Sequence, residues 1–87
     1  VIISGDVHWC EYSEIRDSGW AWPLMELTSS GLTETWTAIS PNRHRVGEAF
    51  AVANYGLIDI DWTGTRPAVT LQVKDASGAV LIDRAAR

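Results

Sequence analysis

The stretch AVTLQVKDASGAVLID (residues 68–83) decides how this chain folds, because it has the pattern of a β-hairpin. Val69, Leu71 and Val73 alternate with polar residues, which is the period of a strand with one buried and one solvated face. The segment DASG (75–78) supplies residues typical of a tight turn, and AVLID (79–83) runs back as a second strand.

The preceding segment extends this hairpin into a meander. In GLIDIDW (56–62), Ile58, Ile60 and Trp62 share one face, while aspartates occupy the other. The turn-forming segment TGTRP (63–67) then leads into the hairpin. We therefore expect an antiparallel meander with one apolar face. That face needs a partner layer, which 87 residues hardly supply.

The first half of the chain has weaker signals. WCEYSEIR (9–16) is consistent with either an extended segment or a short helix, and LMEL (24–27) predicts a short strand. The hydroxyl residues at 28–30 predict the cap of a brief helical turn. AFAVANY (49–55) predicts a further strand in which Phe50 and Val52 share a face.

The amino-terminal segment VIISGDVHWCE (1–11) carries the candidate chemistry. Its first three residues predict the end of a buried strand, and Gly5 gives the backbone room to turn. Asp6 and His8 follow, at the kind of strand end where open α/β sheets bind ligands. A carboxylate and an imidazole placed there can hold a metal ion. Aspartate and histidine two residues apart are common by chance, so the spacing alone favours a turn cap and a surface imidazole.

Composition limits the classes of partner. The chain has 11 acidic and 7 basic residues, a net charge of -4, and its only basic cluster is Arg43–Arg45, which argues against a nucleic-acid partner. No apolar stretch approaches the ~20 residues that span a bilayer. The single cysteine cannot form a disulfide within the chain. Because Val1 lies inside a predicted strand, we expect the chain to be part of a longer protein.

Four segments, in order, resemble the carboxyl-terminal part of the PhoD-like alkaline phosphatases, a branch of the calcineurin-like metallophosphoesterases. They are SGDVH (4–8), SSGLT (29–33), PNRHRVG (41–47) and NYGLIDIDW (54–62). The resemblance implies an α/β fold, a two-sheet sandwich flanked by helices. Residues 1–87 would be the mostly antiparallel carboxyl-terminal part of that single domain.

The resemblance also implies a function and a site. Gly5-Asp6-Val7-His8 matches the last metal motif of the superfamily, G-H-x-H, with aspartate in place of the first histidine. Asp6 and His8 would then each bind one of two metal ions, iron and calcium, which hydrolyse a small-molecule phosphate mono- or diester. The other ligands and catalytic residues would lie upstream of Val1, so the piece alone is expected to be inactive. Family members of this kind are secreted or periplasmic.

One position departs from the family pattern, and two neighbours of His8 invite a role. Where PhoD-like proteins often have histidine after S-S-G-L-T, this chain has Glu34, which we interpret as a packing or solvent-facing residue outside the site. Glu11 is a candidate acceptor for the second ring nitrogen of His8, or a solvated carboxylate. Cys10 is more simply a small buried hydrophobe than a ligand.

Other polar residues have a simple structural explanation beside the functional one. Arg43 and Arg45 are suited to bind substrate phosphate, but a solvated loop is the simpler interpretation. Asp59 and Asp61 resemble a calcium pair, although their alternation with isoleucines favours the solvated face of a strand.

A different class of function also stays open. A non-catalytic β-rich module would bind carbohydrate through aromatic side chains and would need no metal. The candidate residues for it are Trp20, Trp22 and Trp36.

Overall fold

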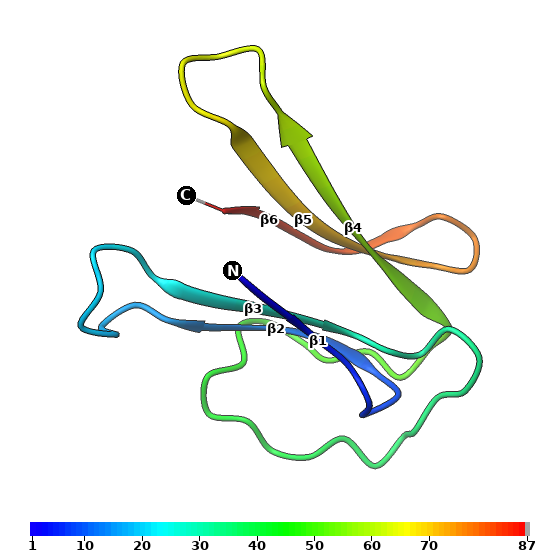
Figure 1. The fold of residues 1–87 in the computed structure, drawn as a ribbon. Coiled ribbons are helices and arrows are strands. Elements are labelled where there is room, and N and C mark those ends of the chain that lie inside the picture. The colour runs from blue at the N-terminus through cyan, green and yellow to red at the C-terminus, as the bar shows by residue number, and fades with distance from the viewer. Residues whose placement is uncertain (87) are drawn as a thin grey trace.

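The computed structural model describes residues 1–86, which form two three-stranded sheets (Figure 1). The first sheet has the order β1-β3-β2 and the second has the order β4-β5-β6. None of the described residues forms a helix, so this part of the chain has no helix that could cross a membrane. The strands are β1 (Ile2–Ser4), β2 (Cys10–Ile15), β3 (Leu24–Ser29), β4 (Asn54–Asp61), β5 (Ala68–Asp75) and β6 (Val80–Ala86).

The second sheet is the predicted antiparallel meander. β5 pairs with β4 on one edge and with β6 on the other, both antiparallel. The β5–β6 turn is stabilised by Asp75, whose carboxylate accepts hydrogen bonds from the backbone of Ser77 at 2.8 Å and of Ala79 at 3.0 Å. The predicted alternation is confirmed on β5, where Leu71 and Val73 are fully buried.

The first sheet combines a parallel and an antiparallel pair. β1 runs parallel to β3, and β2 runs antiparallel to it. Residues 9–16 thus take the extended alternative. The predicted strand at 24–27 continues to Ser29, so the predicted helical turn near 28–30 is wrong. Thr28 pairs with Ser4 of β1 on one side and with Glu11 of β2 on the other. The backbone N–H and C=O groups of this segment are therefore satisfied by neighbouring strands and not by a helical turn.

The predicted strand over residues 49–55 is also wrong, since only Asn54 and Tyr55 belong to β4. Phe50 instead exchanges two backbone hydrogen bonds with Cys10, at 2.9 and 3.1 Å. The side chain of Asn54 donates to the carbonyl of Val52 at 2.8 Å. These non-local and side-chain bonds bend the chain where propensity alone predicts a strand.

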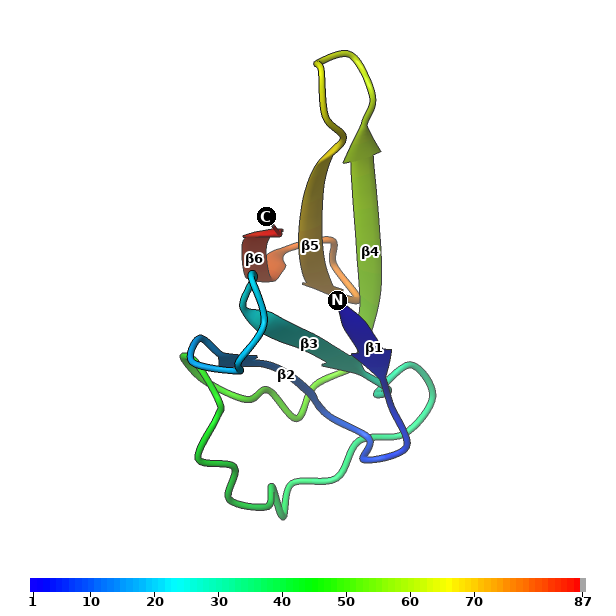
Figure 2. The ribbon, with the colours of Figure 1, turned by 60° about the vertical axis from the view of Figure 1, so that its left-hand side comes forward.

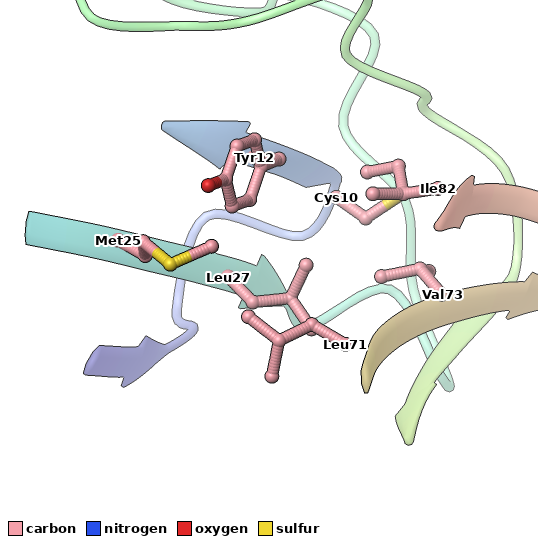
Figure 3. Close-up of a cluster of buried hydrophobic side chains, with 7 residues drawn as sticks. All are labelled: Cys10, Tyr12, Met25, Leu27, Leu71, Val73 and Ile82. Carbon is pink, nitrogen blue, oxygen red and sulfur yellow. The ribbon is translucent and has the colours of Figure 1, made fainter. Parts of the chain in front are cut away.

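The core lies between the two sheets (Figure 3). β2 and β3 contribute alternate side chains from one side, and β5 and β6 contribute from the other, as expected of two packed sheets. The buried cluster comprises Cys10, Tyr12, Met25, Leu27, Leu71, Val73 and Ile82.

Two apolar strands lie largely outside this core. Figure 2 shows the β4–β5 arm extending beyond the first sheet. The apolar face of Ile58, Ile60 and Trp62 is largely uncovered, as expected of a face whose partner layer 87 residues hardly supply, and Ile58 is 45% exposed. The predicted burial of residues 1–3 is wrong, with Ile3 65% exposed. An open cleft of about 490 Å³ lies between β1 and β4.

Candidate functional site

Three of the family-like segments meet at one end of the first sheet. A side chain at Gly5 would place its Cβ 3.1 Å from the Cβ of Ser30, so the two loops are in close contact. The hydroxyl of Ser30 accepts a hydrogen bond from the backbone N–H of His8 at 3.0 Å. The backbone N–H of Asn54 donates to the carbonyl of Gly31 at 3.2 Å. The segments 4–8, 29–33 and 54–62 therefore form one junction.

Gly31 is required at this junction because it has no room for a side chain. A Cβ there would overlap the side-chain amide of Asn54 and lie 3.0 Å from the carbonyl oxygen of Val52. Asn54 is itself buried, and its amide oxygen accepts from the hydroxyl of Ser29 at 2.6 Å. The S-S-G segment thus holds the start of β4 in place.

Asp6 and His8 lie in the loop that joins β1 to β2, which we call the His8 loop (residues 5–8). Their φ angles are 73° and 63°, and within residues 1–86 they are the only non-glycine residues with positive φ. The left-handed conformation costs roughly 1–2 kcal/mol for such residues. Strain of this kind clusters at functional sites. The two predicted metal ligands are thus the two strained residues of the described chain.

The ring of His8 is held from several directions. It stacks on the indole of Trp36, with ring centroids 4.5 Å apart and planes at 12°. The carbonyl of His8 also accepts the backbone N–H of Trp36 at 3.0 Å. The Nδ1 atom is buried and has no hydrogen-bond partner among the described residues. An imidazole with an unsatisfied buried nitrogen calls for an explanation.

The sequence predicts that Glu34 packs or faces solvent outside the site, whereas the structure places its carboxylate beside His8. Glu34 Oε2 lies 3.6 Å from His8 Nδ1. The Glu34 side chain is 65% exposed, so it faces solvent and the imidazole together. The sequence signal that could have identified Glu34 is its place directly after the family-like segment SSGLT (29–33).

The donor types in the His8 loop fit part of a metal centre. Asp6 is exposed, and the imidazole ring of His8 is held by its stack on Trp36. A hard carboxylate and an imidazole suit divalent or trivalent first-row metals. Within residues 1–86, no group of three or more His, Cys, Asp or Glu side chains is placed to hold a metal ion. The loop therefore fits a centre that further ligands complete.

Glu11 belongs to a separate cluster, the Glu11 network (Trp9, Glu11, Asn42 and Arg45). Its buried carboxylate accepts from Trp9 Nε1 at 2.7 Å, Arg45 Nε at 2.8 Å and Asn42 Nδ2 at 3.1 Å. Burial raises the pKa of Glu11, but these hydrogen bonds outweigh it and leave the pKa below its ordinary value. Neither alternative considered for Glu11 holds: its carboxylate is buried rather than solvated, and it accepts hydrogen bonds from these three side chains instead of from the His8 ring.

The same network removes a candidate phosphate ligand. Arg45 is bound to Glu11 and, through a second nitrogen, to the carbonyl of Ser40 at 2.6 Å. Arg43 is exposed, and its side chain donates to the ring of His44 at 3.3 Å. The segment 41–47 therefore attaches a long loop to β2. This contact joins residues far apart in the chain, so local sequence patterns do not predict it.

The remaining candidates take structural roles. Cys10 is fully buried, and this burial raises the pKa of its thiol to about 11, which makes it a packing residue. Asp61 accepts hydrogen bonds from the backbone and hydroxyl of Thr63 in the turn after β4. Asp59 is exposed, as expected of a solvated face, although Ile58 on the opposite face of β4 is exposed as well.

No protein-family model, curated protein or solved structure matches this chain.

Proposed function

We propose that this chain is the carboxyl-terminal part of a PhoD-like phosphatase domain, in which Asp6 and His8 bind a two-metal centre that hydrolyses phosphate mono- or diesters. One observation carries the proposal. The residues that match the metal motif are also the two non-glycine residues held at positive φ within residues 1–86, on a loop whose histidine ring is held by its stack on Trp36. Aspartate and histidine also adopt positive φ in ordinary turns, so the fixed imidazole ring is the more specific of the two features.

The chemistry of each side chain supports its role. Two bound metals would lower the pKa of a water and neutralise charge on the phosphoryl oxygens. Asp6 supplies a hard anionic oxygen donor, which suits calcium and ferric iron, the pair that the resemblance implies. His8 supplies a nitrogen donor whose ring plane Trp36 fixes before any metal arrives. Contact with Ser30 at Gly5 keeps both residues at the end of β1.

The wider fold is part of the same proposal. The exposed apolar side chains of β1 and β4 support a larger α/β sandwich in which further layers, with helices outside, cover these strands. The net charge of -4 is compatible with a small phosphate ester as substrate, positioned by metals, and argues against a nucleic-acid partner. A secreted or periplasmic location rests on the resemblance alone.

The test is hydrolysis of p-nitrophenyl phosphate and bis-p-nitrophenyl phosphate by the full-length protein. We expect activity that a chelator removes and that added iron and calcium restore. We expect His8→Ala to lower kcat by several orders of magnitude, because it removes a metal ligand. The matched control is His44→Ala, since the other histidine of the chain is half-buried on the loop beside β2 and its ring accepts a hydrogen bond from Arg43, not from the His8 loop. Activity of His8→Ala within a few-fold of the parent would remove His8 from the centre.

A carbohydrate-binding module is the second candidate, and one observation favours it. Trp20 and Trp22, on the loop between β2 and β3, are 76% and 63% exposed. Trp36, in contrast, gives one ring face to His8. Oligosaccharide binding that survives chelation, and that Trp20→Ala with Trp22→Ala abolishes, would support this candidate. Elemental analysis of the intact protein separates the two, because the module needs no metal.

A further inference from the structure

The carboxylate of Glu34 is not used in the function proposed above, yet it faces a specific atom of His8. Its Oε2 lies 3.6 Å from Nδ1, which is too long for a hydrogen bond but within the range of an ion pair. Because most of the Glu34 side chain is in solvent, a small rotation closes this gap without disturbing packing. Nδ1 of His8 cannot move to the same extent.

The orientation of the His8 ring is fixed by contacts on both sides of its Cα. The backbone N–H of His8 donates to Ser30, and its carbonyl accepts from Trp36. The stack on the Trp36 indole then sets the plane of the ring. Turning the imidazole out of this plane would break the stack. The structure therefore presents Nδ1 to Glu34 rather than to solvent.

The chemistry of a metal-bound histidine makes this contact informative. A neutral imidazole has one N–H and one lone pair, so the nitrogen that binds a metal leaves the other nitrogen protonated. That second nitrogen almost always donates to a carboxylate, a carbonyl or a water, which fixes the tautomer. In His8 the buried Nδ1 lacks a partner, and the carboxylate of Glu34 is the acceptor at hand.

We propose that Glu34 is a positioning residue: it accepts the Nδ1 proton of His8 and so leaves Nε2 as the metal-binding nitrogen. The inference rests on the proposed function only in taking His8 as a ligand. Its competitor is direct binding of metal by Glu34 together with Nδ1. That arrangement requires the opposite tautomer, with the proton on Nε2.

The test reads the tautomer directly, by long-range ¹H–¹⁵N NMR of histidine-labelled, metal-free full-length protein, with the His8 signals assigned from His8→Gln. We expect the Nδ1–H tautomer in the parent. In Glu34→Ala we expect the Nε2–H tautomer to become a major species. Glu34→Gln keeps an oxygen acceptor and should largely restore the parent spectrum. Glu48→Ala, which removes the same charge from another exposed position, should change nothing.

Metal affinity provides the second measurement. Loss of such an outer partner typically lowers metal affinity 10–100-fold. We expect a decrease of about that size for Mn²⁺ binding by calorimetry in Glu34→Ala, but affinity near the parent's in Glu34→Gln and Glu48→Ala.

Each outcome decides between the two proposals. An unchanged tautomer in Glu34→Ala, or Nε2–H in the parent, would overturn the positioning role, and the latter would favour Glu34 as a ligand. A tautomer that depends on Glu34 in a parent that binds no metal would support the orientation of His8 and overturn the proposed function. Metal-dependent activity with no effect of Glu34→Ala on the tautomer or the metal affinity would support the proposed function and overturn the positioning role of Glu34.

Discussion

The Glu11 network and the His8 loop adjoin in the sequence, yet they differ in how their polar groups are satisfied. In the network, one buried carboxylate accepts hydrogen bonds from three side chains. In the loop, two residues hold strained backbone angles and His8 Nδ1 has no hydrogen-bond partner. The carboxylate of Glu11 is thus fully hydrogen-bonded within the protein, whereas Nδ1 of His8 makes no hydrogen bond to the described residues.

We propose that this difference separates structural polar residues from candidate functional ones. A buried group whose bonds are all made stabilises the fold and has nothing left for a ligand. A group that is strained and unsatisfied costs stability, and such a cost persists where something other than folding requires it. The comparison predicts that substitutions in the two regions act on different measurements.

The largest effect on stability is expected for Glu11→Ala. Removal of one partner from a buried charge pair costs about 3–5 kcal/mol, because the other charge is left uncompensated. Chemical denaturation of the full-length protein measures this loss. Replacing Glu11 and Arg45 together should cost less than the sum of the two single changes. A Glu11→Ala variant as stable as the parent would contradict the structural assignment of the network.

A smaller loss is expected for Gly31→Ala at the junction of the loops. The added methyl group overlaps Asn54 and approaches the backbone at Val52, and such overpacking costs about 1–3 kcal/mol. Gly64→Ala, in the turn after β4, is the matched control, since an added Cβ there has one neighbouring atom within 4 Å, the backbone oxygen of Arg66 at 3.6 Å. Equal melting temperatures for the two variants would contradict the tight packing of Gly31 against Asn54.

The acid sensitivity of the network follows from the lowered pKa of Glu11. Because the folded-state pKa lies below the ordinary value of 4.5, the carboxylate contributes stability that is complete above that pH. The contribution is lost as the pH falls below 4.5 and through the folded-state value. The stability difference between the parent and Glu11→Gln should therefore shrink on acidification. A difference that stays constant from neutral pH to pH 3 would show that the ionised carboxylate is not what stabilises the network.

The smallest effect has the opposite sign and belongs to the His8 loop. Glycine tolerates the left-handed conformation that His8 adopts, so His8→Gly should be about 1 kcal/mol more stable than His8→Ala. Both variants lack the imidazole and should be equally inactive. Thermal melts of the two proteins compare them directly, and greater stability of the alanine variant would argue against strain at this position.

Local signals predicted part of this structure, and contacts between distant residues explain the rest. The alternation around Leu71 and Val73 is visible in the sequence because a strand repeats every two residues. The pairing of Glu11 with Arg45 and of His8 with Glu34 joins residues 34 and 26 positions apart, which no periodicity encodes. The motif predicts Asp6 and His8 as metal ligands, but it does not predict their positive φ angles. The exposure of β4 agrees with the expectation that 87 residues hardly supply a partner layer for the meander, since alternation shows which side chains share a face but not what covers that face.

The most direct test of the metal centre is anomalous X-ray diffraction from crystals of the full-length protein grown with iron and calcium. We expect anomalous peaks within about 2.0–2.6 Å of an Asp6 carboxylate oxygen and of His8 Nε2, the range of metal–oxygen and metal–nitrogen bonds. Ordered Asp6 and His8 side chains without a metal peak beside them, in crystals saturated with both metals, would contradict the proposal. The His8 loop would then be a strained turn with no ligand.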